Sequence, residues 1–197
     1  MAYIMEQATP PPRLNPQLAK IVEVILFLVD EGARRGLTLT QYDIVKSVFL
    51  ADKRHLDEYG RPVTFDNYSA MLHGPVPSAT YDMLKPNYDW ARLGMETAPW
   101  VRTQRQGTPA AEFRPTRSAN LKKLSLSDVE ALGSALSLAK SLTFGGLREY
   151  THKNRAYEAA WRDSDIVKAF DMDYRLIPDF DDPELIEDLA YASRHMH

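Results

Sequence analysis

Histidine and aspartate are the residues of this sequence whose types could perform acid–base or metal chemistry. The chain has five histidines, at positions 55, 73, 152, 195 and 197. Asp52 and His55 are three residues apart, so they share one face of a helix. With His73 or His152 they could form a metal site, but no HExxH or similarly spaced ligand motif is present. We therefore interpret Asp52, His55 and His152 as a structural, hydrogen-bonded polar cluster and expect no metal.

The sequence contains no motif typical of nucleophilic catalysis or of cofactor binding. There is no GxSxG elbow, and neither a GxxxxGK[ST] loop nor a GxGxxG loop is present. The sequence contains no cysteine, which removes disulfides, thiolate metal sites and cysteine nucleophiles. We expect no catalytic residue and no cofactor, with a metal-dependent enzyme as a minor alternative.

Composition indicates one domain in a reducing compartment. The 197 residues are 44% hydrophobic and carry a formal net charge of -3, so no overall basic field favours nucleic acid. The first residues lack the pattern of a signal peptide, and the longest apolar run, Val24–Val29, is too short to span a bilayer. We expect a cytoplasmic protein that binds no membrane.

Charge is distributed unevenly along the chain. Val101–Lys123 holds six basic residues against Glu112, whereas Asp163–Asp188 holds ten acids against two basic residues. These segments are either two solvated faces or a basic patch for an acidic partner beside an acidic tail.

Helical periodicity and capping signals predict a mainly α, single compact helical domain. Residues 1–13 are proline-rich and predicted to be disordered, 14–162 form the domain, and 163–197 form an acidic extension whose terminal helix packs on or beside it. Thr40 and Asp43 form a capping-box pattern that begins the helix carrying Asp52 and His55, and Gly60 ends it. Ser127 with Glu130 predicts another capped helix. A small β-hairpin is expected at about residues 100–114.

The segment Arg61–Pro77 is expected to be irregular, and its last four residues are Gly74-Pro75-Val76-Pro77. Each proline removes a donor and fixes φ, so this stretch is stiff. It is either a connector between helices or a preorganised partner-binding surface. For the second reading we select a set of neighbouring residues: His73, Gly74, Pro75, Val76, Pro77 and Tyr81.

A DNA-binding regulator is a further alternative. Leu39-Thr40-Gln41 followed by Tyr42–Leu56 partly resembles a helix-turn-helix, although its expected recognition face is apolar and includes Asp52. That composition disfavours nucleic acid as a partner.

A family pattern covers most of the central chain. Its blocks are Phe49-Leu50-Ala51-Asp52, His55-Leu56, Tyr59-Gly60-Arg61-Pro62-Val63-Thr64, Tyr68, His73-Gly74-Pro75-Val76-Pro77 and Tyr81. Leu147, Thr151-His152 and Trp161 follow downstream. The pattern resembles the Panacea domain of SocA-like and GepA-like antitoxins. The resemblance implies a mainly helical fold and a bacterial, non-enzymatic antitoxin that neutralises a cognate toxin protein by direct binding. In the SocA-like branch it also implies an adaptor that delivers the toxin to the ClpXP protease.

Overall fold

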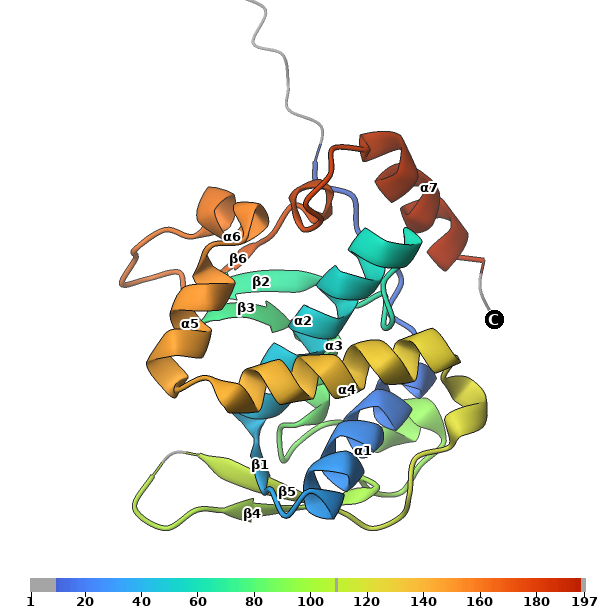
Figure 1. Ribbon diagram of the computed structural model, residues 1–197, viewed down its shortest axis with the longest axis vertical. Coiled ribbons are helices and arrows are strands. Elements are labelled where there is room, and N and C mark those ends of the chain that lie inside the picture. The colour runs from blue at the N-terminus through green and yellow to red at the C-terminus, as the bar shows by residue number, and fades with distance from the viewer. Residues whose placement is uncertain (1–9, 109, 196–197) are drawn as a thin grey trace, which may run out of the picture.

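The computed structural model describes residues 10–108 and 110–195 (Figure 1), and helix α2 (Gln41–Tyr59) runs through its centre. The predicted capping box is confirmed, because Thr40 accepts from the Asp43 backbone N–H and Asp43 from that of Thr40. Gly60 ends the helix in the left-handed conformation, at a φ of 68°. Every residue from 43 to 52 is buried, so α2 forms the core of the molecule.

Two other helices pack on α2. Figure 1 shows α4 (Leu126–Ser141) lying across α2 and α1 (Leu18–Arg34). The capping box of α4 lies two residues earlier than predicted, because it pairs Ser125 with Asp128. Ser127 instead turns its hydroxyl toward His55.

The predicted hairpin is confirmed. Strands β4 (Trp100–Gln104) and β5 (Ala111–Pro115) pair antiparallel, and β1 (Leu39–Thr40) adds to β5, giving the order β1-β5-β4. Trp100 and Phe113 are buried, which attaches this sheet to the helices.

A second sheet corrects the expectation of an irregular segment before Pro77. Strands β2 (Tyr68–Met71) and β3 (Gly74–Pro77) form a hairpin, and β6 (Ala169–Asp171) joins β2, giving the order β3-β2-β6. The prolines argued against a strand because they cannot donate to a ladder. They are tolerated because β3 lies at the edge of the sheet, where only one side of the strand must pair. The molecule is mainly α with β elements rather than helical with a single hairpin.

Shorter helices complete the described chain. They are α3 (Ser78–Met83), α5 (Phe144–His152), α6 (Arg155–Ala160) and α7 (Pro183–Ser193), with 3-10 turns at Trp90–Leu93, Leu121–Lys123 and Tyr174–Leu176. The break between α4 and α5 falls at Leu142 and Thr143, where Thr143 caps α5. No helix within residues 10–108 and 110–195 is long and apolar enough to cross a bilayer.

The acidic extension contributes to the described structure. Strand β6 pairs with β2, Tyr174 is buried, and α7 buries Ile186 and Ala190. Residues 1–9 of the N-terminal segment predicted to be disordered lie outside the described residues. Residues 196 and 197, at the other end of the chain, also lie outside them. Arg13, within the described part, forms an ion pair with Asp171 of β6 at 2.8 Å.

Candidate functional site

Asp52 of α2 holds the segment that leads into β2. Its carboxylate accepts hydrogen bonds from the backbone N–H groups of Val63 and Thr64, both at 2.9 Å. It also accepts from the Thr64 hydroxyl and, at 2.7 Å, from the Tyr68 hydroxyl. Burial raises the pKa of Asp52, and the hydrogen bonds from Thr64 and Tyr68 oppose that rise. With four internal donors around it, the carboxylate is directed into the core and away from any partner.

His55 is fully buried one turn further along α2. Its Nδ1 donates to the carbonyl of Arg61 at 2.7 Å, and its Nε2 lies 3.0 Å from Ser127 Oγ and 3.4 Å from Asp128. Burial lowers the pKa of His55, so the neutral ring is favoured. His55 thereby ties the end of α2 to the start of α4.

His152, the third member of the predicted polar cluster, lies in a different environment. It is in the last turn of α5, where its ring stacks on Tyr157 with centroids 4.2 Å apart. Burial and the positive charges of Arg148 and Lys46 lower the pKa of His152 to about 4. The structure therefore places Asp52 and His55 on one helix and His152 with a separate, basic group of residues.

Lys46 is the centre of that basic group. The side chain is completely buried, and its ammonium donates to the carbonyl of Pro75 at 2.9 Å. Burial lowers the pKa of Lys46 to about 7. Lys46 was not among the residues predicted from the sequence, because a lysine on an otherwise apolar helix is usually at the surface.

Gly74 makes this packing possible. Its φ of +100° is unfavourable for other residues, and a Cβ there would lie 2.6 Å from Lys46 Nζ and 2.8 Å from Thr151 Oγ1. Hairpin β2–β3 therefore approaches α2 and α5 as closely as a residue without a side chain allows.

The predicted partner-binding residues do not all face the solvent. Gly74, Pro75, Val76 and Pro77 are buried in β3. Val76 nevertheless borders, together with the exposed His73 and the half-buried Tyr81, a hollow of about 400 Å³ between the β2–β3 hairpin, the start of α2 and the start of α5. We call this region the hairpin surface, and its main side chains are Tyr42, Leu72, His73, Val76, Tyr81 and Phe144.

Aromatic rings and an exposed leucine give the hairpin surface its character. Phe144 packs on Tyr42 at 4.6 Å and on His73 at 5.3 Å between ring centroids. Leu72 and Phe144 are each 54% exposed. A cluster of large apolar side chains exposed to solvent is typical of a protein-binding surface. Neither residue was predicted, because each is ordinary in sequence and only the fold brings the two together.

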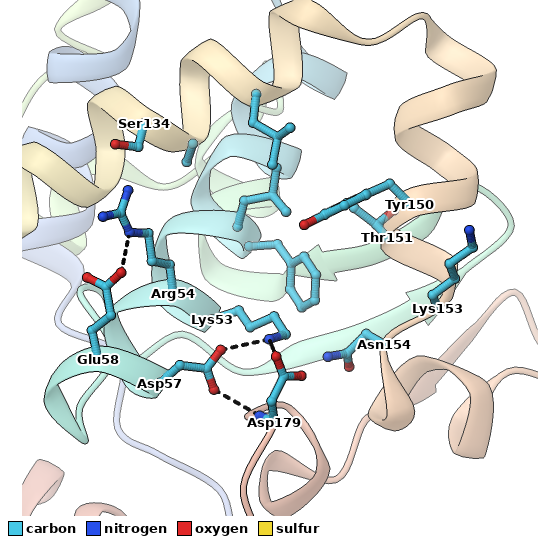
Figure 2. Close-up of a pocket in the computed structure, with 14 residues that line it drawn as sticks. Lys53, Arg54, Asp57, Glu58, Ser134, Tyr150, Thr151, Lys153, Asn154 and Asp179 are labelled. Atoms are coloured by element: carbon cyan, nitrogen blue, oxygen red, sulfur yellow. Dashed lines mark hydrogen bonds and ion pairs between the residues drawn. The ribbon is translucent and has the colours of Figure 1, made fainter.

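A second hollow, of about 630 Å³, lies between α2, α4 and α5. Figure 2 shows Lys53 between Asp57 and Asp179, with both N–O distances 2.7 Å, and Arg54 bonded to Glu58 at 2.7 Å. Tyr150 forms part of the wall of this groove and is 51% exposed. The charges at its rim are neutralised internally, which distinguishes it from the hairpin surface.

The described residues also bear on the two alternative functions. Among residues 10–108 and 110–195, no three His, Asp or Glu side chains converge as a metal site would require. Helix α2, which partly resembles a recognition helix, is buried from residue 43 to 52 and presents no face there to a DNA groove. In the basic segment, Arg117 is committed to Glu23, with two bonds of 2.8 and 2.9 Å.

Comparison with protein families identifies the chain. The family model described as "Antitoxin SocA-like, Panacea domain" matches residues 44–158, which is more than half of the chain. The match covers α2 from residue 44 onward and the main side chains of the hairpin surface other than Tyr42. The chain belongs to this family of antitoxin-like proteins. No curated protein and no solved structure gives a significant match.

Proposed function

We propose that this protein is an antitoxin that neutralises a cognate toxin protein in the bacterial cytoplasm by binding it directly. The observation that carries the proposal is the family match over residues 44–158. Apart from Tyr42, the main side chains of the hairpin surface lie within those residues, and they supply a partly exposed apolar surface of the kind that protein partners bury. This role requires no catalytic residue and no cofactor.

The test is to look for a small open reading frame beside the gene for this protein and to ask whether this protein rescues cells from its product. We expect co-expression to restore growth and the two proteins to purify together. Toxicity that persists at full co-expression, without co-purification, contradicts the proposal.

Two aromatic residues of α5 allow a test of where the toxin binds. Phe144 and Tyr150 are similarly exposed, at 54% and 51%, but Phe144 belongs to the hairpin surface and Tyr150 to the groove of Figure 2. We expect Phe144→Ala to weaken toxin binding by about 2 kcal/mol, roughly thirtyfold, as truncation of an interface aromatic does. Tyr150→Ala should bind as the wild type does. The reverse order of effects, measured by calorimetry, moves the toxin contact to the groove.

We further propose that the protein acts as an adaptor that delivers the toxin to ClpXP. An adaptor needs a second surface, separate from the one that binds the toxin. Helix α7 offers exposed acids, among them Glu187 and Asp188, and it also buries Ile186 and Ala190. Charge reversal is therefore a cleaner test than deletion of the helix.

Purified components decide between adaptor action and simple sequestration. With ClpXP present, we expect the toxin to disappear faster when this protein is added, while the protein itself persists. The double variant Glu187→Lys, Asp188→Lys should retain toxin binding and slow degradation, whereas Glu130→Lys on the exposed side of α4 should not. If this protein does not change the lifetime of the toxin, adaptor action is refuted and sequestration is the mechanism that remains.

A further inference from the structure

Arg148 stands at the edge of the hairpin surface without an acidic partner. It is exposed on α5, and its Nε donates to the carbonyl of Leu72 at 3.2 Å. Within residues 10–108 and 110–195, no carboxylate lies within ion-pair distance of it. Its two terminal nitrogens therefore remain available beside Leu72 of the hairpin surface.

Other basic groups surround the same position. His73 is exposed on the turn between β2 and β3, and Lys46 and His152 lie behind it. Burial lowers the pKa of His73 and of His152, and the charges of Arg148 and Lys46 lower both pKa values further. Asp43, whose charge acts on the neighbouring Tyr42, is already bonded to Thr40 and Lys140.

The groove of Figure 2 provides the contrast. There, Lys53, Arg54 and Lys153 each have a carboxylate within 3.6 Å. Positive charge is thus internally compensated in the groove and left uncompensated at the hairpin surface.

We infer that the hairpin surface binds a segment of the toxin in which an Asp or Glu lies next to a large apolar side chain. The carboxylate would take two parallel hydrogen bonds from Arg148, because a guanidinium presents paired donors that match a carboxylate. The apolar side chain would enter the hollow against Leu72 and Phe144. This inference rests on the proposed antitoxin function and names the chemistry of the contact.

A peptide carboxylate fits this surface better than a nucleic-acid phosphate. Binding along a nucleic acid requires a track of cations that follows the backbone. Here one exposed arginine and one histidine border an apolar hollow, and the chain as a whole carries a net charge of -3. A single carboxylate flanked by an apolar residue satisfies both parts of the surface.

The test uses the full-length protein as bait for a displayed library of random peptides. We expect the enriched peptides to share an Asp or Glu close to Leu, Phe or Trp. The most enriched peptide is then labelled, and its affinity is measured by fluorescence anisotropy. Arg148→Glu should weaken binding at least about tenfold, because one attractive pair becomes repulsive. Arg148→Lys should bind with intermediate affinity, because lysine retains the charge without the paired donors.

Two further variants keep the result interpretable. His73→Glu alters the turn of the β2–β3 hairpin rather than α5, and it should also weaken binding of the peptide. Lys153→Glu changes the charge five residues beyond Arg148, at the C-terminal cap of α5 in the groove of Figure 2, and should bind within about twofold of the wild type. Thermal melts of each variant separate lost binding from lost folding.

Three outcomes overturn the inference. They are enriched peptides without an acid, unchanged affinity in both Arg148→Glu and His73→Glu, and tighter binding of a labelled single-stranded RNA at this same surface. None of these results requires the toxin, so each leaves the rescue test of the antitoxin function intact. Conversely, failure of the rescue test with acidic peptides still bound refutes the antitoxin role and preserves the surface.

Discussion

Lys46 gives a pH-dependent stability that can be worked out from its environment. The ammonium is completely buried with one hydrogen bond, to Pro75, and burial lowers its pKa from 10.5 to about 7. The unfolded chain holds the proton up to about pH 10.5, whereas the folded chain releases it near pH 7. Between these values unfolding takes up a proton, so the free energy of unfolding rises with pH.

The magnitude follows from the two pKa values. One pKa unit corresponds to about 1.4 kcal/mol, and the full shift spans about 3.5 units. From about pH 7, where the folded amine is half protonated, to about pH 9.5, this group alone should stabilise the protein by about 3 kcal/mol. Higher pH is avoided because the pKa values of Tyr68 and Tyr174 are raised by burial, so ionisation of those residues destabilises the folded protein.

The perturbation is Lys46→Met, which keeps the length and volume of the side chain and removes the ionisable group. Urea unfolding of wild type and variant at about pH 7 and about pH 9.5 measures how the free energy of unfolding of each protein changes with pH. We expect the wild type to gain about 3 kcal/mol more than the variant over this interval. Lys85→Met, at a partly exposed position on the surface, is the matched control and should follow the wild type. An equal change of stability with pH in the wild type and in Lys46→Met refutes the assignment of a buried amine whose pKa is lowered to about 7.

Three further predictions concern buried residues of α2 and of the segment from Thr64 to Gly74, and urea unfolding measures each of them. Asp52→Ala leaves two buried backbone N–H groups without an acceptor and should cost about 2–6 kcal/mol, whereas Asp52→Asn, which keeps one acceptor oxygen, should cost clearly less; equal losses contradict the hydrogen-bonding role. Gly74→Ala combines an unfavourable φ with a Cβ 2.6 Å from a buried nitrogen and should cost about 2–4 kcal/mol. Gly107→Ala, at a φ of +72° in open space, should lose only about 1–2 kcal/mol, and a loss as large as that of Gly74→Ala shows that crowding is not the cause. Tyr68→Phe removes a hydrogen bond to a carboxylate and should cost about 1.5–3 kcal/mol, while Tyr174→Phe removes a buried hydroxyl that has no partner among the described residues and should be neutral or stabilising; a larger loss for Tyr174→Phe contradicts this difference.

Local sequence signals predicted several elements whose physics is local, although the capping box of α4 was placed two residues too late. Thr40 and Asp43 begin α2, and Gly60 ends it, because capping and the left-handed conformation depend on the residues themselves. The alternating stretches around residues 100–114 form the expected hairpin for the same reason. The family was also predicted correctly from the sequence, and the run from Phe49 to Tyr81 that carries the pattern lies within the matched residues.

Pairing and proximity were decided by the tertiary structure. Pro75 and Pro77 argued against a strand, yet the edge position of β3 tolerates them, because only one side of an edge strand must pair. Leu72 and Phe144 are 72 residues apart by number and meet only because α5 packs beside the β2–β3 hairpin. His152 carries the same side chain as His55, but its neighbours are Lys46 and Arg148 rather than Asp52. The sequence by itself thus determined the ends of α2, the main helices and the family, through interactions between near neighbours along the chain. The buried amine and the hairpin surface arise from contacts between distant segments, so only the tertiary structure could decide them.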